Sequence, residues 1–181
     1  IKPENTLLFE GGSGKLNLTL KLTDFGQAHT EPTLIDAYGS YVTMAPEVLR
    51  NRWLSHSKLG EFREVYECSK ADAWSVGATI YFALHARYPC DNFEYSQLSS
   101  VFRTHCLTDP DDNFYLAHLD ELMGKPRVQL TRQCVQLLDR LLEVDFTQRE
   151  AITDTTLNEW FNEEENPSIL NSFLQLFGCF C

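Results

Sequence analysis

The stretch KLTDFGQAHTEPTLIDAYGSYVTMAPEVLR, residues 21–50, decides how the rest of the chain is interpreted. The alternation of apolar and polar residues that is typical of a strand ends at Asp24-Phe25-Gly26. Residues 27–44 then show no sustained hydrophobic period and are rich in Thr, Tyr, Gly and Ser, which predicts a long loop. Ala45-Pro46-Glu47 begins a short predicted helix. Long loops inside compact domains are uncommon and usually functional, so we expect this part of the chain to carry the chemistry.

A β-hairpin is predicted just before this stretch. Leu7-Leu8-Phe9 is a short apolar run, and the leucines of residues 16–22 alternate with polar residues, which is the pattern of a half-buried strand. The glycine-rich segment 11–14 between the two runs predicts the turn.

The rest of the chain predicts mainly helices. The predicted central helix has Ser69 as its N-cap, Asp72 three residues later, few charges, and Pro89 as its end. Residues 51–68 are polar and irregular and predict a surface insertion. Further helices are predicted in residues 95–104, around an apolar face of Val135, Leu138, Leu141 and Leu142, after Thr153 with Trp160 and Phe161, and in residues 168–177. The predicted fold class is mainly α (α+β), a helical bundle with a short β-hairpin near the N-terminus.

Composition and charge narrow the range of functions. The 181-residue chain is long enough for one domain with a proper core. Its net charge of −11 argues against binding to nucleic acid or to an anionic membrane, and no apolar run reaches the roughly 18 residues of a membrane helix. The cysteines form no C-x-x-C pair, which argues against a zinc site and suits a reducing compartment, so we expect a cytoplasmic or nuclear location. The six are Cys68, Cys90, Cys106, Cys134, Cys179 and Cys181.

Several motifs follow one another in a distinctive order. Ile1-Lys2-Pro3-Glu4-Asn5 comes first, Asp24-Phe25-Gly26 second and Ala45-Pro46-Glu47 third, before Lys70-Ala71-Asp72-Ala73-Trp74-Ser75-Val76-Gly77. In this order and spacing the chain resembles the C-terminal lobe of a serine/threonine protein kinase. The resemblance covers residues 1–161 and leaves residues 162–181 as an acidic and apolar tail.

The first motif resembles the end of the kinase catalytic loop, whose pattern begins with His-Arg-Asp. The resemblance implies that this triplet lies upstream, with the catalytic aspartate immediately before Ile1. We therefore expect the chain to be a fragment that lacks the N-terminal lobe, and to have no useful kinase activity alone.

The resemblance also implies the cofactors, ATP and Mg²⁺, and the residues that hold them. Asp24 would be the chief magnesium ligand and Asn5 the second, since hard cations prefer oxygen ligands. Lys2 would reach the transferring phosphoryl group and offset its developing negative charge. Taken singly, Asn5 and Asp24 could be turn residues and Lys2 an exposed terminal charge.

Further residues have architectural or substrate-facing roles by resemblance. Glu47 would pair with Arg149, because a buried carboxylate needs a partner. Asp72 would hold the catalytic-loop backbone by hydrogen bonds, the alternative being a plain acid near a helix N-terminus. Ser40 would contact the catalytic aspartate and Lys2, and Phe25 and Gly26 complete the motif around Asp24.

Residues 24–47 resemble an activation loop, with Thr30, Thr33 and Tyr38 as candidate phosphorylation sites. A phosphate would order this loop only if arginines face it. Thr43 replaces the usual aromatic residue before the third motif, Phe146 replaces a common proline, and residues 51–68 lengthen the link to Asp72, which leaves the subfamily open.

Two functions remain open. The first is an active serine/threonine kinase that acts on protein substrates, with Glu4 expected to attract a basic residue of the substrate. The second is a pseudokinase or a C-lobe scaffold that binds partners without catalysis. The presence of Lys2, Asn5 and Asp24 favours the first, because a scaffold has no physical need for both magnesium ligands.

Overall fold

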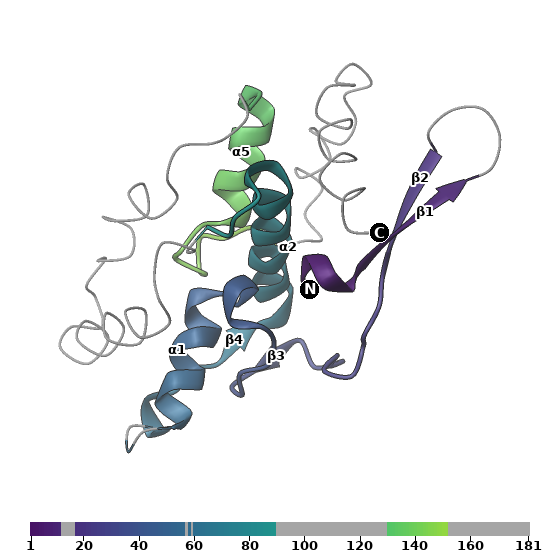
Figure 1. Ribbon diagram of the computed structural model, residues 1–181. Helices are drawn as coiled ribbons and strands as arrows, with labels where there is room; N and C mark the ends of the chain where they lie inside the picture. Colours follow the sequence, from purple (N-terminus) through teal and green to yellow (C-terminus); the bar gives the residue numbers. More distant parts are fainter. Residues whose placement is uncertain (12–16, 57, 59, 90–129, 152–181) are drawn as a thin grey trace.

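The computed structural model describes residues 1–11, 17–56, 58, 60–89 and 130–151, in which a hairpin and short strands accompany three helices (Figure 1). The predicted mainly helical class with an N-terminal hairpin is confirmed. The helices predicted in residues 95–104, after Thr153 and in residues 168–177 lie outside the described residues. The elements are the 3-10 turns Pro3–Asn5, Tyr41–Thr43 and Gly60–Phe62, the strands β1 (Thr6–Gly11), β2 (Asn17–Leu22), β3 (Thr33–Leu34) and β4 (Tyr66–Glu67), and the helices α1 (Pro46–Ser55), α2 (Cys68–His85) and α5 (Arg132–Leu141).

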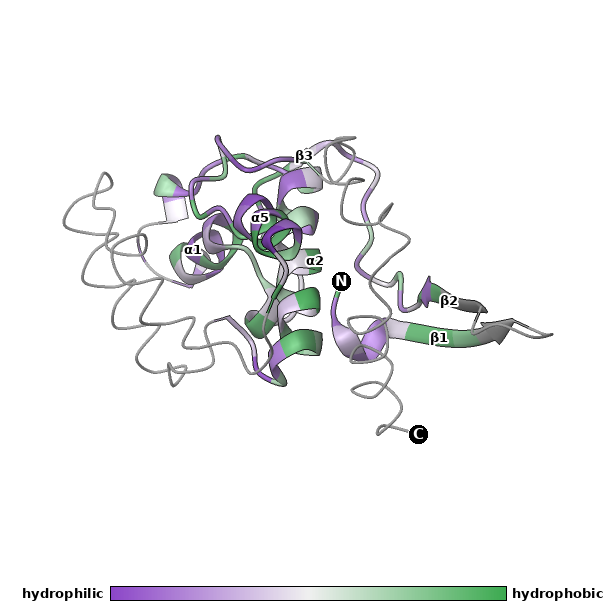
Figure 2. Ribbon diagram, turned by 90° about the horizontal axis from the view of Figure 1, so that it is seen from above, coloured by the Kyte–Doolittle hydropathy of each residue, from purple (hydrophilic) through white to green (hydrophobic). Residues whose placement is uncertain are grey.

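Strands β1 and β2 form the predicted hairpin, antiparallel and in register from the Thr6–Leu22 pair to the Gly11–Asn17 pair. The expectation of a half-buried strand is wrong for the leucines of β2 that the structure describes, because Leu20 is 51% exposed and Leu22 47%. Figure 2 shows the cause: the hairpin projects away from the helices, and the hydrophobic face of β1 projects with it.

Helix α2 is the centre of the core. Its apolar residues pack with α5, and Gly77 lies where the two helices approach most closely. A Cβ atom placed on Gly77 would lie 2.8 Å from Leu141 Cβ and 3.0 Å from two Leu142 side-chain carbons. The glycine therefore sets how closely α5 can pack on α2.

The predicted boundaries of α2 are wrong at both ends. The helix begins at Cys68 with Glu67 as its N-cap, and not at Ser69, because the chain enters it directly from β4 and the Cys68 N–H donates to the Pro32 carbonyl at 2.9 Å. The helix ends at His85, before Pro89 is reached, because Ala86 adopts the left-handed conformation with φ 54° and closes the last turn.

Helix α5 confirms the amphipathic helix predicted near Val135, with one change to its apolar face. Thr131 is its N-cap, and the Thr131 side chain accepts a hydrogen bond from the Cys134 N–H. Val135 is 41% exposed, whereas Cys134 and Leu137 are buried. The buried face is therefore Cys134, Leu137, Leu138 and Leu141.

The prediction that residues 51–68 are an irregular surface insertion is confirmed only in part: most of the described residues there are exposed or partly exposed, but much of the segment has regular structure. Helix α1 continues to Ser55, and β4 follows a 3-10 turn. Asn51, Leu54 and Tyr66 are buried, with exposed fractions of 2%, 1% and 5%.

Within the ranges that the structure describes, none of the helices combines the length and apolar character that a membrane crossing requires.

Candidate active site

The polar residues selected from the sequence gather around one cavity. It has a volume of about 330 Å³ and lies between the start of the chain, the loop that follows β2, and the first turns of α2. Its lining includes Lys2, Asn5, Asp24, Ser40 and Asp72. A cavity of this size with convergent polar groups is typical of a small-ligand site.

Asn5 and Asp24 are in direct contact at this cavity. The Asn5 amide nitrogen Nδ2 donates to Asp24 Oδ2 at 3.2 Å. The backbone supports this contact, because the Thr23 N–H donates to the Asn5 carbonyl at 2.9 Å and so joins the end of β2 to the first 3-10 turn. The Asp24 residue remains exposed, so its carboxylate is open to a ligand.

The backbone of Asp24 has an unusual conformation that was not expected from the sequence. Its φ of 62° lies in the left-handed region, which costs most residues about 1–3 kcal/mol and is tolerated best by Gly, Asn and Asp. Such strain gathers at functional sites when the surrounding structure enforces it. Phe25 follows with 68% of its surface exposed, and its carbonyl accepts from the Ala28 N–H at 3.0 Å in the turn that contains Gly26.

Lys2 and Ser40 both line the cavity but are not hydrogen-bonded to each other. The backbone carbonyl of Lys2 accepts from the Asn5 N–H at 3.1 Å, while its ammonium makes no ion pair within the described part of the chain. The Ser40 carbonyl accepts from the Thr43 N–H at 3.1 Å. Of the described residues, none bonds the hydroxyl of Ser40, so the contact with Lys2 that the resemblance implies is absent here.

Asp72 faces the cavity from the first turns of α2. Partial burial of its carboxyl raises the pKa of Asp72. Hydrogen bonds from the catalytic-loop backbone to Asp72, which the resemblance implies, do not occur among the described residues. The hydrogen bonds of the Ile1 to Asn5 backbone, the part of that loop present in this chain, go to residues of this turn, to Thr6 and to Thr23.

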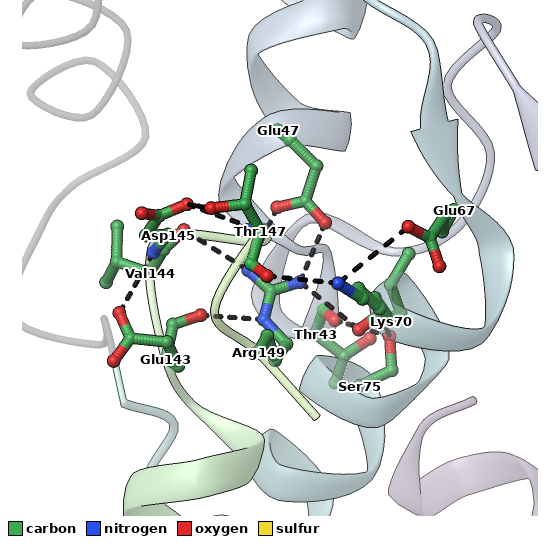
Figure 3. A network of polar contacts seen from close by, with 11 residues as sticks. Thr43, Glu47, Glu67, Lys70, Ser75, Glu143, Val144, Asp145, Thr147 and Arg149 are labelled. Carbon is green, nitrogen blue, oxygen red and sulfur yellow. Dashed lines mark hydrogen bonds and ion pairs between the residues drawn. The ribbon is translucent and has the colours of Figure 1, made fainter. Parts of the chain in front are cut away.

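Thr43 and Ser75 were not selected as site residues, yet they tie the loop to α2. Thr43 is 2% exposed, and its carbonyl accepts from the Ser75 hydroxyl at 2.8 Å (Figure 3). The same hydroxyl lies 3.2 Å from the Ala71 carbonyl. No sequence signal marks this bond, because it joins residues that are distant in the chain.

Glu47 and Arg149 form the centre of a network of polar contacts (Figure 3). Arg149 Nη1 and Nη2 donate to the two carboxylate oxygens of Glu47 at 2.7 and 3.0 Å. The remaining donors reach backbone carbonyls: Nε that of Glu143 at 2.6 Å, Nη1 that of Lys70 at 3.2 Å and Nη2 that of Val144 at 3.3 Å. The guanidinium thus joins α1, α2 and the segment after α5, and it fixes the end of the loop that contains Ser40.

The candidate phosphorylation sites Thr30, Thr33 and Tyr38 are all exposed. Tyr38 contacts the ring of His29, with centroids 4.4 Å apart. In the described ranges, no arginine or lysine side chain forms a hydrogen bond or a cation–π contact with any of these three residues.

Comparison with known proteins places the chain in a family. Residues 1–161 match the protein kinase domain. Similar proteins include the probable serine/threonine-protein kinase fhkD of Dictyostelium discoideum, 28% identical over 91% of this chain and 20% of that protein. Serine/threonine-protein kinase ULK3 of Rattus norvegicus is 30% identical over 93% of this chain and 30% of its own length. Serine/threonine-protein kinase SRK2I of Arabidopsis thaliana is 26% identical over 94% of this chain and 41% of its own.

The chain spans well under half the length of these relatives. The match to the protein kinase domain nevertheless covers most of the chain, and the ordered motifs, the cavity and the Glu47–Arg149 pair all fall inside the matched residues. The chain belongs to the protein kinase family, and the relatives it resembles are serine/threonine kinases.

Proposed function

We propose that this chain is the C-terminal lobe of an active serine/threonine protein kinase, which transfers the γ-phosphoryl group of ATP to serine or threonine hydroxyls of protein substrates. The observation that carries the proposal is the contact of Asn5 with Asp24 at the cavity, 3.2 Å between the amide nitrogen and the carboxylate oxygen. Both side chains offer oxygen ligands, and they come from separate segments that converge on one place.

The pair fits Mg²⁺ by its donor chemistry. Magnesium in phosphoryl-transfer enzymes is held by one or two protein oxygen ligands, and phosphate oxygens and water complete the coordination. Asp24 would supply a carboxylate and Asn5 an amide oxygen. When bound, the ion would neutralise negative charge on the phosphate oxygens of ATP. The left-handed backbone of Asp24 supports this assignment, because strain of this kind gathers at functional sites.

Lys2 and Ser40 complete the proposed site. Lys2 lines the same cavity, and its ammonium has no carboxylate partner among the described residues, so it would be available to a phosphoryl group. Ser40 would contact the catalytic aspartate and Lys2 and so help to select a hydroxyl substrate, and residues 24–47 would form the activation loop. The proton acceptor would be an aspartate before Ile1, and an N-terminal lobe would cover the nucleotide. We therefore propose that this chain is inactive without them.

Glu4 is proposed to attract a basic residue of the substrate. It is exposed, and its Oε1 accepts a hydrogen bond of 3.4 Å from the Tyr88 hydroxyl. The net charge of −11 is compatible with basic protein partners.

The function is tested on the complete kinase with labelled ATP, Mg²⁺ and a serine-containing peptide. Asp24→Asn should lower phosphoryl transfer by about 100-fold or more, because it removes a charge at the reacting phosphates. Glu31→Gln is the matched control, since Glu31 is an exposed acid of the same loop whose contact is with His29 at 3.7 Å. It should leave the rate within about twofold. A folded wild-type protein that transfers no phosphate would contradict the proposal and favour the scaffold.

A further inference from the structure

Residues 32–36, in the middle of the proposed activation loop, are bonded along their whole length to another part of the chain. The partner is residues 60–68, which we name the latch segment, together with Asn51 of α1. In other words, the lengthened link between Glu47 and Asp72 folds back on the loop.

The backbone supplies the first set of contacts. Strands β3 and β4 pair antiparallel, with Thr33 opposite Glu67 and Leu34 opposite Tyr66. The Cys68 N–H extends this pairing to the Pro32 carbonyl at 2.9 Å. A two-residue ladder is weak alone, so side-chain contacts must support it.

Asn51 supplies the second set. Its Nδ2 donates to the Ile35 carbonyl at 3.1 Å and to the Glu64 carbonyl at 2.6 Å, while its Oδ1 accepts from the Glu64 N–H at 3.0 Å. The side chain is buried and bridges the loop to the latch segment. Loss of the amide would leave these backbone groups without partners.

Asp36 makes the third set, through both its backbone and its side chain. Its carbonyl accepts from the buried Tyr66 hydroxyl at 2.7 Å, and its carboxylate accepts from Arg63 Nη1 at 2.8 Å. The Arg63 side chain is 27% exposed and that of Asp36 59%. Arg63 also donates through Nε to the Gly60 carbonyl at 3.1 Å, which fixes the direction of the guanidinium.

We propose that the latch segment, residues 60–68, holds the loop ordered without phosphorylation, with Asp36 on Arg63 in the place that a loop phosphate on an arginine would otherwise take. The regulatory meaning of this device rests on the proposed kinase function. The ordering itself follows from the contacts and does not require that function.

The surroundings of the candidate phosphorylation sites agree with this inference. Thr33 lies directly opposite Glu67, and directly opposed side chains of an antiparallel pair share one face of the sheet. A phosphate on Thr33 would therefore meet the Glu67 carboxylate, which already pairs with the Lys70 ammonium at 3.8 Å. Thr30 is followed directly by the acidic residue Glu31. Arg63, the arginine of the latch segment, is already paired with the carboxylate of Asp36. A phosphate at these positions would oppose the ordered loop.

The test is amide hydrogen exchange of residues 33–36 in the complete kinase, since Pro32 has no amide hydrogen. Asp36→Asn should speed their exchange by about two- to fivefold, as expected for loss of a partly exposed ion pair. Asn51→Ala should speed it by about tenfold or more. Glu64→Gln is the matched control: it removes an ion pair of 3.2 Å with Arg50, and Glu64 is 60% exposed, but that pair does not reach the loop. It should leave the exchange of residues 33–36 unchanged.

Two further arms make the proposal decisive. The charge swap Asp36→Arg with Arg63→Asp should restore slow amide exchange of the loop. Phosphatase treatment of the wild type should change neither the amide exchange nor the phosphoryl-transfer rate by more than about twofold relative to the untreated protein. The proposal would be overturned if Asp36→Asn and Glu64→Gln changed the amide exchange of the loop equally, or if phosphatase treatment made that exchange fast. An inactive wild type with the expected exchange pattern would contradict the proposed function and still support the latch.

Discussion

Arg149 and Glu47, 102 positions apart in the chain, form a two-point ion pair in which the arginine side chain is completely buried. The Arg149 guanidinium also lies over the ring of Trp74, 5.1 Å from its centroid. The pair therefore connects α1, which follows the loop that contains Asp24 and Ser40, with the first turns of α2 and with the segment after α5.

The pair makes a first prediction about stability. Arg149→Ala should lower the free energy of unfolding by about 3–5 kcal/mol, because the Glu47 carboxylate would stay buried without a partner and three backbone carbonyls would lose a donor. Urea denaturation measures this. Arg140→Ala is the control, since Arg140 forms a more exposed contact of 3.7 Å with Glu150, and it should cost no more than about 1 kcal/mol. Equal costs for the two variants would show that the buried pair has no special role.

His85 makes a second prediction, on pH. His85 is 1% exposed, and burial lowers the pKa of His85 below its ordinary value of 6.5, although the hydrogen bond to the Tyr81 carbonyl opposes that shift. The folded state therefore holds a neutral ring, and the unfolded chain binds more protons below pH 6.5. The free energy of unfolding should fall as the pH drops through 6.5, by up to about 1.4 kcal/mol per pH unit.

His85→Phe should remove this contribution to the pH slope and keep the ring that stacks on Tyr81 at 4.0 Å. His56→Gln, at an exposed position, should leave the slope unchanged. Denaturation series between pH 5 and pH 8 measure both. An unaltered slope in His85→Phe would mean that the buried ring is not the group responsible.

Gly77 makes a third prediction, on packing. Gly77→Ala places a Cβ 2.8 Å from Leu141 Cβ, an atom close to its own backbone that cannot move freely. The cost of overpacking, about 1–3 kcal/mol, should exceed the gain of about 1 kcal/mol from better helix propensity. Gly60→Ala is the control, because its nearest neighbour would be the Leu54 carbonyl oxygen at 3.7 Å. A thermal midpoint for Gly77→Ala equal to that of the wild type would contradict the prediction.

The parts of the fold that were predicted correctly are those that a local pattern encodes. Alternation over residues 16–22 predicted β2, and the apolar period around Leu138 predicted α5. The start of α2 was missed because its entry depends on β4, which pairs with β3 from a distant part of the chain. A cap residue such as Ser69 reports only local preference, and here the tertiary contact decided the boundary.

The candidate site shows the same division. The order of short motifs led to Asn5, Asp24 and Arg149, and the structure brings Asn5 and Asp24 together. The role of Asn51 was not predicted, because a buried amide that bridges two loops leaves no periodic trace in the sequence. The left-handed conformation of Asp24 was missed as well, since aspartate is common in many turn conformations.

That conformation makes the last prediction. At Asp24, where φ is 62°, glycine should be more stable than alanine by about 1 kcal/mol, because only alanine clashes in the left-handed region. Both variants lose the hydrogen bond from Asn5, so their difference isolates the backbone term. At Glu31, which is not among the residues with positive φ, the order should reverse, with alanine more stable by up to about 1 kcal/mol. Urea denaturation of the four variants measures the two differences. If alanine were more stable than glycine at both positions, the Asp24 backbone would not be strained. If glycine is more stable at Asp24 and alanine at Glu31, the left-handed conformation of Asp24 costs the fold stability.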